Sequence, residues 1–416
     1  MAAIEKQIPE EDALCQSIQQ LKIDNPEWGV KSIYNQILKS HQDWQVSEKR
    51  VKKIMQTQGL TQSSGGAQLS IVKSGVEDDP SVPVSFIDPK LDFQSFSPNV
   101  VAKMVDNVTG KGLFAAKDIK KDEIIFMEAP LVYFPPWEGF TLARTGDACG
   151  LCCKPFTRAV RVGVRCTKCD IMYCNKQCKA TAMETFHPLE CPGLNPVMGD
   201  FMNFCAGERW QAPMAVARMY CHMMLAHQRG ELDTVLMHYN AFATVNQAER
   251  QAKETEWIFM EHPTRELWAK ARAKLSAALN PPSKKCKINT PLPDALANQL
   301  FNDEDTFLNY LGKFNINNQN GGMYLVHSHI NHNCTPNVSI DYPSTQQTQY
   351  KLMVRAIRDI KKDEQLFESY VNPRWNKETR QNYLSKSYMF DCKCERCETD
   401  GPLTDELRKG LRLRAE

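Results

Sequence analysis

The sequence predicts an α+β protein: a β-rich domain of small sheets, split by a cysteine-rich finger and a helical insert, and preceded by a helical domain. The hexapeptide Asp-Ile-Lys-Lys-Asp-Glu occurs at 118–123 and again at 359–364, and an apolar strand follows each copy. Four closely spaced pairs of metal-ligand residues lie between the copies, at 149–191. We therefore expect two matching strand-turn-strand units that belong to one β-fold.

Length and composition indicate a globular chain with several domains. The 416 residues are 42% hydrophobic, which is enough for buried cores, and the formal net charge is +2. This balance argues against a broad electropositive face for duplex DNA, so a nucleic-acid partner is disfavoured. The apolar stretch from Pro213 to Leu225 is interrupted by Arg218 and His222, which favours a buried helix over a membrane span, and no membrane partner is expected.

Sixteen cysteines in a chain without an N-terminal apolar leader favour metal ligation in a reducing compartment over a disulfide framework. We therefore expect a nuclear and cytoplasmic protein.

Residues 1–60 predict a small helical domain. Apolar residues recur at helical spacing in three groups: Leu14, Ile18 and Leu21; Ile33, Tyr34, Ile37 and Leu38; Val51, Ile54 and Met55. Ser47 stands where it would cap the third helix. The basic run at 49–53 resembles that of a recognition helix, but a solvated face on a docking module is favoured. Gln, Ser, Gly, Asp and Pro then predict a linker over 61–90.

The rest of the chain alternates between β-rich and other segments. Short apolar runs rich in Val, Ile and Phe predict β-hairpins over 95–148, and a second β-rich half is expected over 313–371. The segment 192–312 is predicted to be helical, and residues 372–416 carry a cysteine trio. The insertions separate the two β halves in sequence without necessarily separating them in space.

The segment 149–191 carries eight potential zinc ligands in four pairs. They are Cys149 and Cys152, Cys166 and Cys169, Cys174 and Cys178, and His187 and Cys191. Zn²⁺ prefers four thiolate or imidazole donors in a tetrahedron, and one tight turn can supply two of them. Two zinc ions are expected, and they are structural because no coordination position is left open. Metal binding should supply about 10 kcal/mol or more of folding free energy per site.

This ligand order resembles the MYND finger, and the resemblance implies an alternating assignment. One ion would take Cys149, Cys152, Cys174 and Cys178, and the other would take Cys166, Cys169, His187 and Cys191. Cys153 is then spare. The resemblance also implies proline-rich peptides as partners of the finger.

A third zinc ion is expected near the C-terminus. Cys392, Cys394 and Cys397 offer three donors, and Cys334 is the obvious fourth. The neighbouring His327 and His329 are expected to be structural, because each proposed zinc already has four donors.

Several motifs, in order, resemble the SET domain. The heptapeptide Asn-His-Asn-Cys-Thr-Pro-Asn at 331–337 resembles the family's Asn-His-x-Cys-x-Pro-Asn. Residues 111–114 resemble its cofactor loop, 368–370 its segment ending in the catalytic tyrosine, and 388–397 its post-SET tail. Residues 100–400 are thus similar to the SMYD-type SET and MYND proteins, and the N-terminal helical region resembles a fungal histone-methylating branch.

The resemblance implies a protein lysine methyltransferase that uses S-adenosylmethionine. It implies cofactor contacts from Lys111, Gly112, Leu113, Asn317, Asn331, His332, Tyr370 and Phe390. Tyr370 would stand beside the transferring methyl as the catalytic phenol, and Tyr388 would help line the channel for the substrate lysine. Lysine has a reference pKa of about 10.4 and reacts only as the neutral amine, so desolvation in an apolar channel would favour the loss of its proton.

The family implies a histone tail or another lysine-containing peptide as substrate, with histone H4 the leading candidate. Two residues depart from the family pattern: Asn333 replaces a serine, and Glu368 stands where an apolar residue is usual. Glu368 is expected either to attract a basic peptide or to face solvent. Because the chain ends soon after Cys397, we also expect no C-terminal helical domain like that of animal relatives, and a more open cleft.

Two other classes of protein compete with the enzyme. A non-catalytic adaptor in transcriptional regulation would bind peptide motifs through the finger and carry an inert SET fold. Tyr370, Asn331 and His332 argue against it, because an inert scaffold does not require the phenol. A DNA-binding regulator would depend on the finger and the basic third helix, and the charge balance makes it the weakest alternative.

Overall fold

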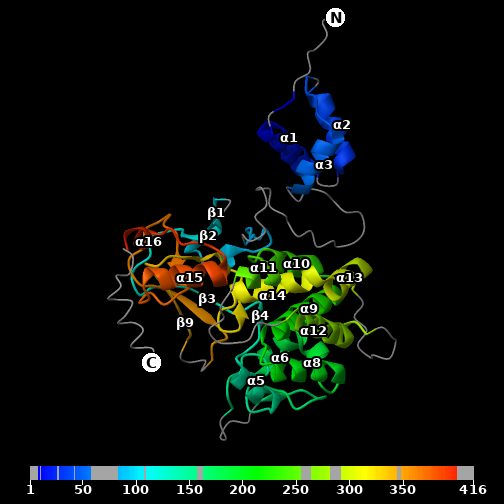
Figure 1. The fold of residues 1–416 in the computed structure, drawn as a ribbon, viewed down its shortest axis with the longest axis vertical. Coiled ribbons are helices and arrows are strands. Elements are labelled where there is room, and N and C mark those ends of the chain that lie inside the picture. Colours follow the sequence, from blue (N-terminus) through cyan, green and yellow to red (C-terminus); the bar gives the residue numbers. More distant parts are fainter. Residues whose placement is uncertain are drawn as a thin grey trace, which may run out of the picture. The chain divides into compact units, whose positions relative to one another are not determined.

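The computed structural model describes residues 8–9, 11–25, 28–41, 43–57, 83–106, 109–156, 163–253, 264–281, 292–343 and 348–400. The chain divides into two compact units, Met1–Asp78 and Asp79–Glu416, and each is described by itself (Figure 1). The linker predicted at 61–90 lies outside the described residues as far as residue 82, and so does the chain beyond residue 400.

In the described part of the first unit there are three helices, α1 (Glu11–Asp24), α2 (Val30–Ser40) and α3 (Glu48–Thr57). Their apolar faces, with Val46 from the segment between α2 and α3, form one core of buried residues: Leu14, Ile18, Ile33, Ile37, Val46, Val51, Ile54 and Met55. The Ser47 Oγ accepts a hydrogen bond from the backbone N–H of Arg50 at 3.2 Å, so the predicted cap is present. The helical spacing of apolar residues therefore predicted this bundle correctly, except that Leu38 is exposed.

The second unit mixes short strands with helices, in an order that follows the chain. The elements up to the end of the finger are α4 (Phe93–Phe96), β1 (Val100–Asp106), β2 (Gly110–Ala115), β3 (Ile124–Glu128), β4 (Val132–Tyr133), α5 (Trp137–Arg144), β5 (Val164–Arg165), β6 (Met172–Tyr173), α6 (Lys176–Thr185) and α7 (His187–Glu190). A run of helices follows: α8 (Pro196–Gly207), α9 (Ala212–Gln228), α10 (Leu232–Asn240), α11 (Gln247–Lys253), α12 (Arg265–Leu279), α13 (Asp294–Asn302) and α14 (Glu304–Asn317). The last elements are β7 (Gly322–Met323), the 3-10 helix η1 (His327–His329), β8 (Asn331–His332), β9 (Val338–Asp341), β10 (Leu352–Ala356), β11 (Phe367–Glu368), α15 (Lys377–Tyr388) and α16 (Glu395–Thr399).

Strands from the two β-rich halves of the sequence pair with each other. In the three-stranded sheet β3-β10-β9, the central strand β10 is antiparallel to β3 from the first half and to β9 from the second. The short strands β4 and β7 also pair across the halves, whereas β1 and β2 form a hairpin within the first half. In Figure 1 strands β1, β2, β3 and β9 lie on one side of this unit and helices α8 to α14 on the other.

The repeated hexapeptide forms a reciprocal contact between the two halves. Ile119 and Ile360 exchange two backbone hydrogen bonds of 2.8 and 2.9 Å. The first aspartate of each copy accepts the N–H of the second lysine of the other copy, at 2.9 Å in both cases. Asp122 and Asp363 occupy equivalent left-handed turn positions, with φ of 68° and 66°. The repetition predicted from the sequence is thus a local two-fold pairing that joins the halves.

The core beneath these strands is also shared. Its fully buried residues come from both halves: Val100, Leu113, Ala115, Ile119, Ile125, Phe126, Tyr324, Val326, Ile330, Val338, Leu352, Val354, Ala356, Ile360 and Leu366. Burial of such a common apolar surface is the main force that holds the halves together. The α+β class predicted from the sequence is confirmed.

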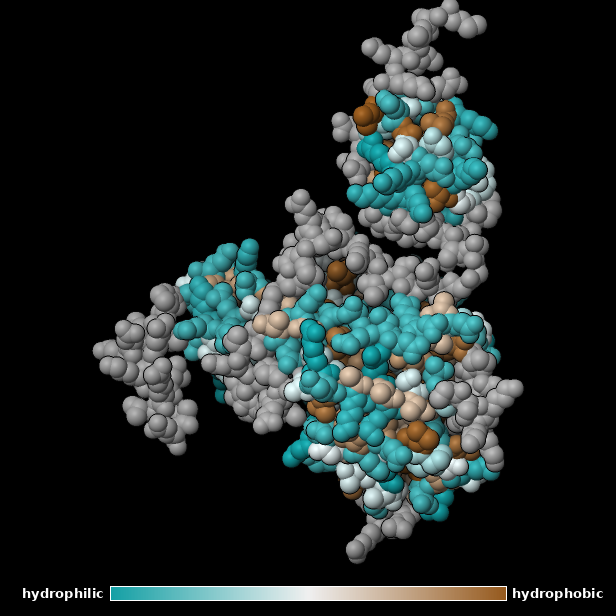
Figure 2. All heavy atoms as spheres, turned by 45° about the vertical axis from the view of Figure 1, so that its right-hand side comes forward, coloured by the Kyte–Doolittle hydropathy of each residue, from teal (hydrophilic) through white to brown (hydrophobic). Residues whose placement is uncertain are grey.

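The helical insert packs mainly on α9. Every residue of α9 from Ala212 to Ala226 is buried, as expected for a buried helix. Among the described residues, no helix is long and apolar enough to span a membrane. The face of this unit seen in Figure 2 is mainly hydrophilic, and its apolar side chains are scattered.

Candidate active site and metal centres

The short strands β8 and β11 bring two of the predicted motifs together. They pair in parallel, with Asn331 opposite Phe367 and His332 opposite Glu368. The backbone N–H of Asn333 continues the pairing and donates to the Glu368 carbonyl at 2.9 Å. The heptapeptide at 331–337 therefore lies beside the strand that leads into Tyr370, although 38 residues separate His332 from Tyr370.

His332 connects Tyr370 to the cysteine motif. The backbone N–H of Tyr370 donates to His332 Nδ1 at 3.0 Å, so Nδ1 is an acceptor. Burial, and then the positive charge of Arg380, lower the pKa of His332 to about 4, so the ring is neutral. A neutral ring with an unprotonated Nδ1 carries its proton on Nε2, which lies 3.3 Å from Cys334 Sγ. His332 therefore holds Tyr370 by one nitrogen and Cys334 by the other.

Tyr370 is a half-buried tyrosine inside an aromatic cluster. Its hydroxyl donates to the Ile330 carbonyl at 2.8 Å. Its ring centroid lies 4.7 Å from that of Tyr388, 5.4 Å from that of His332 and 6.5 Å from that of Phe390. Burial, with a contribution from the Glu368 carboxylate, raises the pKa of Tyr370 well above its usual value. The hydroxyl therefore stays protonated at neutral pH.

The turn that ends α15 positions Tyr388 and Phe390 in this aromatic cluster. Tyr388 ends the helix, and Met389 follows in the left-handed conformation with φ of 66°. This turn brings the ring of Phe390 to 6.0 Å from His332. Burial raises the pKa of Tyr388 as well. The segment at 388–390 thus closes the aromatic cluster over β8 and β11.

Residues 111–113, expected from the resemblance to form a cofactor loop, lie in strand β2 and are joined to the same strands. The Asn331 side-chain N–H donates to the Lys111 carbonyl at 2.9 Å. The Lys111 ammonium points into the protein, where it donates to Ala241 O at 2.8 Å and Ser328 Oγ at 2.9 Å. Burial lowers its pKa to about 7. The backbone of this part of β2, and not the lysine head group, is what faces Asn331.

The surroundings of residues 111–113 suit a polar ligand. A Cβ on Gly112 would lie 2.7 Å from Gln365 Nε2, which is buried without a hydrogen-bond partner. His329 Nε2 is also buried without a partner, while His329 Nδ1 lies 2.9 Å from the Leu325 carbonyl. Burial, and then the charge of Lys111, lower the pKa of His329, so its ring is neutral. Such orphaned polar atoms are the kind that a bound molecule satisfies, so these residues fit S-adenosylmethionine.

Asn317 lies at the end of α14 and is engaged elsewhere. Its side-chain nitrogen donates to Ala243 O at 2.8 Å and to Lys313 O at 2.7 Å. Both amide hydrogens are therefore used within the helical insert, and only the amide oxygen is left for another group.

The structure brings the twelve predicted zinc donors into three tetrads. In each, one donor atom per residue lies within 4.8 Å of the others: Cys149, Cys152, Cys174 and Cys178; Cys166, Cys169, His187 and Cys191; Cys334, Cys392, Cys394 and Cys397. Four thiolates around zinc lie about 3.8 Å apart when each Zn–S bond is about 2.3 Å. The sulfur pairs described for the tetrads lie around this value, from 3.3 Å between Cys174 and Cys178 to 4.0 Å between Cys334 and Cys392. The donor chemistry and the spacing both fit zinc.

The first two tetrads lie in the finger, residues 149–191, around the short strands β5 and β6 and the helices α6 and α7. The hairpin of β5 and β6 presents Cys174, and the Asn175 side chain caps α6 by accepting the N–H of Cys178 at 2.7 Å. Burial lowers the pKa of His187 to about 4, so its imidazole is neutral and able to bind a metal. Cys153, the cysteine expected to be spare, is buried in a left-handed conformation outside both tetrads.

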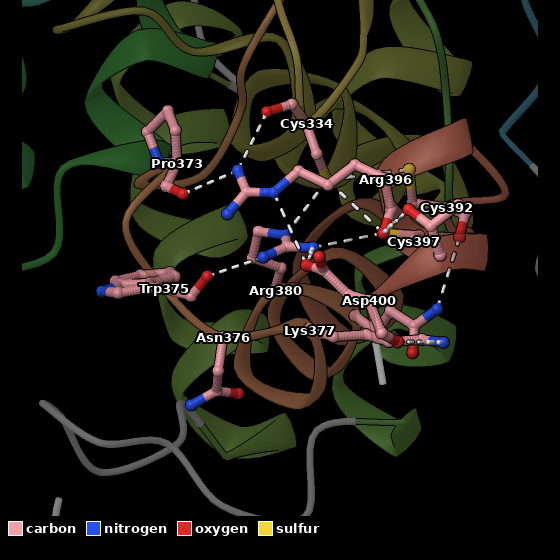
Figure 3. Close-up of polar contacts among 12 residues, drawn as sticks. Cys334, Pro373, Trp375, Asn376, Lys377, Arg380, Cys392, Arg396, Cys397 and Asp400 are labelled. Carbon is pink, nitrogen blue, oxygen red and sulfur yellow. Dashed lines mark hydrogen bonds and ion pairs between the residues drawn. The ribbon is translucent and has the colours of Figure 1, made fainter. Parts of the chain in front are cut away.

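Spacing in the sequence did not reveal the role of Arg380. This residue of α15 is fully buried and hydrogen bonds to two sulfur atoms of the third tetrad (Figure 3). It lies 46 residues from Cys334, and a single arginine in a polar helix carries no signal that would have identified it.

Glu368 is buried, with an exposed fraction of 7%, so the expectation that it faces solvent is wrong. Its Oε1 lies 2.8 Å from His327 Nε2, an ion-pair distance without the alignment of a hydrogen bond. Burial by itself would lower the pKa of His327, but the carboxylates of Glu368 and Glu128 outweigh it and raise that pKa. Charge pairing with a histidine of η1 thus explains a carboxylate where an apolar residue is usual.

Comparison with known proteins identifies relatives over most of the chain. The SET domain family matches residues 222–371. A protein named Histone-lysine N-methyltransferase SET5 from Yarrowia lipolytica is 33% identical over 378 residues, covering 89% of this chain and 77% of that protein. Proteins of the same name from Mycosarcoma maydis and Saccharomyces cerevisiae are 29% and 26% identical, and cover 82% and 94% of this chain and 75% and 76% of their own lengths.

Among solved structures, the SET domain of LSMT bound to lysine and AdoHcy aligns with 72% of this chain and 55% of that chain. Its TM-score is 0.33 and its identity 12%, a likeness too slight to bear on function.

Proposed function

Because this chain belongs to the family of the fungal SET5 histone-lysine N-methyltransferases, we propose that it transfers a methyl group from S-adenosylmethionine to a lysine of a histone, with histone H4 as the leading candidate. Tyr370 and Tyr388 are the proposed catalytic residues. The backbone at Lys111, Gly112 and Leu113, with Asn317, Asn331, His332, Tyr370 and Phe390, would hold the cofactor. A nuclear location follows from a histone substrate, and the cytoplasm is a second proposed location.

The observation that carries the proposal is the hydrogen bond from the Tyr370 hydroxyl to the Ile330 carbonyl. Since this bond uses the only hydrogen of the phenol, the oxygen presents its lone pairs to any further partner. It would accept a hydrogen bond from a substrate amine and orient it. The raised pKa of Tyr370 keeps the phenol neutral, so it orients the amine without acting as a strong base.

The aromatic cluster supports the same function. When bound, S-adenosylmethionine supplies a methyl group on a positively charged sulfur. The rings of Tyr370, Tyr388 and Phe390 lie together and would limit the access of water to the space beside it. In such surroundings a substrate lysine loses its proton more easily, because desolvation disfavours the ammonium form. Positioning and desolvation are therefore what these residues contribute.

The three tetrads are proposed to hold three structural zinc ions. Each has four protein donors and no open position, which is typical of structural sites. The first two would form a MYND-type finger that can bind proline-rich peptides. The third would fasten the C-terminal segment beside Tyr370 through Cys334.

The test is methyl transfer from labelled S-adenosylmethionine to mixed core histones. We expect label on histone H4 with the wild-type chain and a loss of roughly 100-fold or more with Tyr370→Phe. Tyr383→Phe is the matched control, because Tyr383 is an exposed tyrosine of the same region, and it should label normally.

Two outcomes would contradict the proposal. No transfer by a wild-type chain that still binds the cofactor would favour the non-catalytic adaptor. Equal labelling by Tyr370→Phe would mean that Tyr370 is not the catalytic phenol.

A further inference from the structure

Arg380 is a fully buried cation that faces sulfur. Its Nε donates to Cys334 Sγ at 3.2 Å, and its Nη2 donates to Cys397 Sγ at 3.7 Å (Figure 3). Nη1 donates to the Trp375 carbonyl at 2.6 Å, and Nη2 also pairs with Asp400 at 2.8 Å. The contacts with Trp375 and Asp400 therefore hold the guanidinium in place beside the two sulfur atoms.

The charge of the tetrad explains why a cation is buried there. Four thiolates and one Zn²⁺ carry a net charge of −2, and burying such a charge is costly unless it is paired. A neutral thiol is a weak acceptor that would not repay the desolvation of a guanidinium. Asp400 pairs with Nη2, whereas Nε of this fully buried arginine is directed at Cys334 Sγ, and Nη2 also donates to Cys397 Sγ, an arrangement that suits anionic sulfurs.

Arg396 provides a comparison within the same cluster. Its Nη1 donates to the carbonyl oxygens of Cys334, at 3.3 Å, and Pro373, at 2.8 Å, and its Nε lies 3.5 Å from Asp400 (Figure 3). These contacts are to oxygen, and its side chain is 32% exposed. Both arginines thus lie near the same tetrad. In the contacts described for these two residues, only Arg380 donates hydrogen bonds to sulfur atoms of the tetrad.

We propose that Arg380 is a positioning residue that acts as the charge partner of the C-terminal metal centre and slows the release of its metal. The two N–H···S bonds offset the thiolate charge and hold Cys334 and Cys397 in place. Because Cys334 also contacts His332, which accepts the N–H of Tyr370, the same contacts help to fix the backbone at Tyr370. This inference rests on the assignment of zinc to the third tetrad.

The test measures zinc bound to the full chain and its release to a chromogenic chelator. We compare the wild type with Arg380→Gln, which removes the charge, and with Arg380→Lys, which keeps the charge but lacks the planar guanidinium. Arg396→Gln is the matched control. One third of the zinc should leave Arg380→Gln roughly 10- to 100-fold faster than it leaves the wild type. Arg380→Lys should be intermediate, and Arg396→Gln should match the wild type.

Replacement of zinc by Co²⁺ supplies a second readout that folding alone would not move. N–H···S bonds withdraw electron density from a thiolate, so their loss should shift part of the sulfur-to-cobalt charge-transfer absorption to longer wavelength in Arg380→Gln. Arg396→Gln should leave the absorption where it is.

Equal release rates for Arg380→Gln and Arg396→Gln would overturn the role of Arg380 and leave the zinc assignment standing. Faster release of all the zinc by the same factor would also overturn it, because the effect would then be general unfolding. A wild-type chain that binds two zinc ions, and still two after Cys334→Ser, would refute the third zinc site itself.

Discussion

Glu368 Oε1 lies 2.8 Å from His327 Nε2, and this buried pair stands two residues from Tyr370. The backbone N–H groups of Val326 and His327 both donate to the Glu128 carboxylate at 2.9 Å. Glu128 belongs to β3 in the first β half, and Glu368 belongs to β11 in the second. Residues 326–327 are therefore held by carboxylates from both halves. The charge of Glu368 also raises the pKa of Tyr370 and of Tyr388, after burial. The pair is therefore part of the surroundings of the proposed catalytic tyrosines.

Glu368→Gln should reduce stability more at acid than at alkaline pH. The pKa of His327 is raised in the folded protein, so its charged form contributes stability below the unfolded value of about 6.5. That contribution disappears as the pH rises through the folded pKa, and it amounts to about 1.4 kcal/mol for each pKa unit. The measurement is the thermal midpoint at pH 5.5 and at pH 8.5.

Glu364→Gln is the control for that prediction. Hydrogen bonds from Arg358, Lys361 and Asn337 outweigh burial and lower the pKa of Glu364, so its carboxylate is ionised at both pH values. The loss on substitution should be the same at both. A Glu368→Gln loss that is equally independent of pH would contradict the charged His327.

Gly321→Ala should destabilise the second unit by about 2 kcal/mol or more. Gly321 has a φ of 90°, and a Cβ there would lie 2.1 Å from the Phe134 carbonyl oxygen, so both strain and a clash oppose the substitution. Gly199→Ala in α8 is the comparison, because nothing lies within 4 Å of its added Cβ. It should stabilise by about 0.5–1 kcal/mol. Melting curves that shift in the same direction for both variants would count against this account.

Arg218→Met should cost about 3–5 kcal/mol, because it leaves a buried carboxylate unpaired. Arg218 Nε lies 3.2 Å from both carboxylate oxygens of Glu190, and its Nη1 donates to the Tyr133 carbonyl. It thereby joins α7 at the end of the finger to α9 and β4. Adding Glu190→Gln to Arg218→Met should recover part of the loss, and a double-mutant cycle on thermal stability measures the coupling. Additive single losses would indicate that the two charges do not interact.

Cys174→Ser should lower the bound zinc from three ions to two per chain and destabilise the finger. Cys174 belongs to a tetrad of the finger, and structural zinc supplies much of the folding free energy of so small a segment. Cys153→Ser is the matched control, since Cys153 is a buried cysteine of the same finger outside the tetrads. It should keep three ions. Metal analysis of the purified chains decides the matter, and loss of zinc from Cys153→Ser alone would reverse the assignment.

The sequence by itself determined the α+β class, the three-helix bundle and the membership of the two repeated units in one β-fold. These follow from local signals: helical spacing at Leu14 and Ile18, and a repeated turn before an apolar strand at Ile119 and Ile360. A closely spaced pair of cysteines is also a local signal of a metal site, because one tight turn can supply two donors to one metal. The four donors of each proposed zinc site accordingly lie together.

Only the tertiary structure decided what surrounds those donors and the tyrosines. The contact of Arg380 with Cys334 spans 46 residues, and the pair of Glu368 with His327 joins a strand to a 3-10 helix. Whether a charged side chain is exposed or buried depends on which distant residue pairs with it in the fold. A single Glu or Arg in the sequence does not reveal that partner. Local pattern therefore determines which elements form, whereas long-range packing determines which charges they bury.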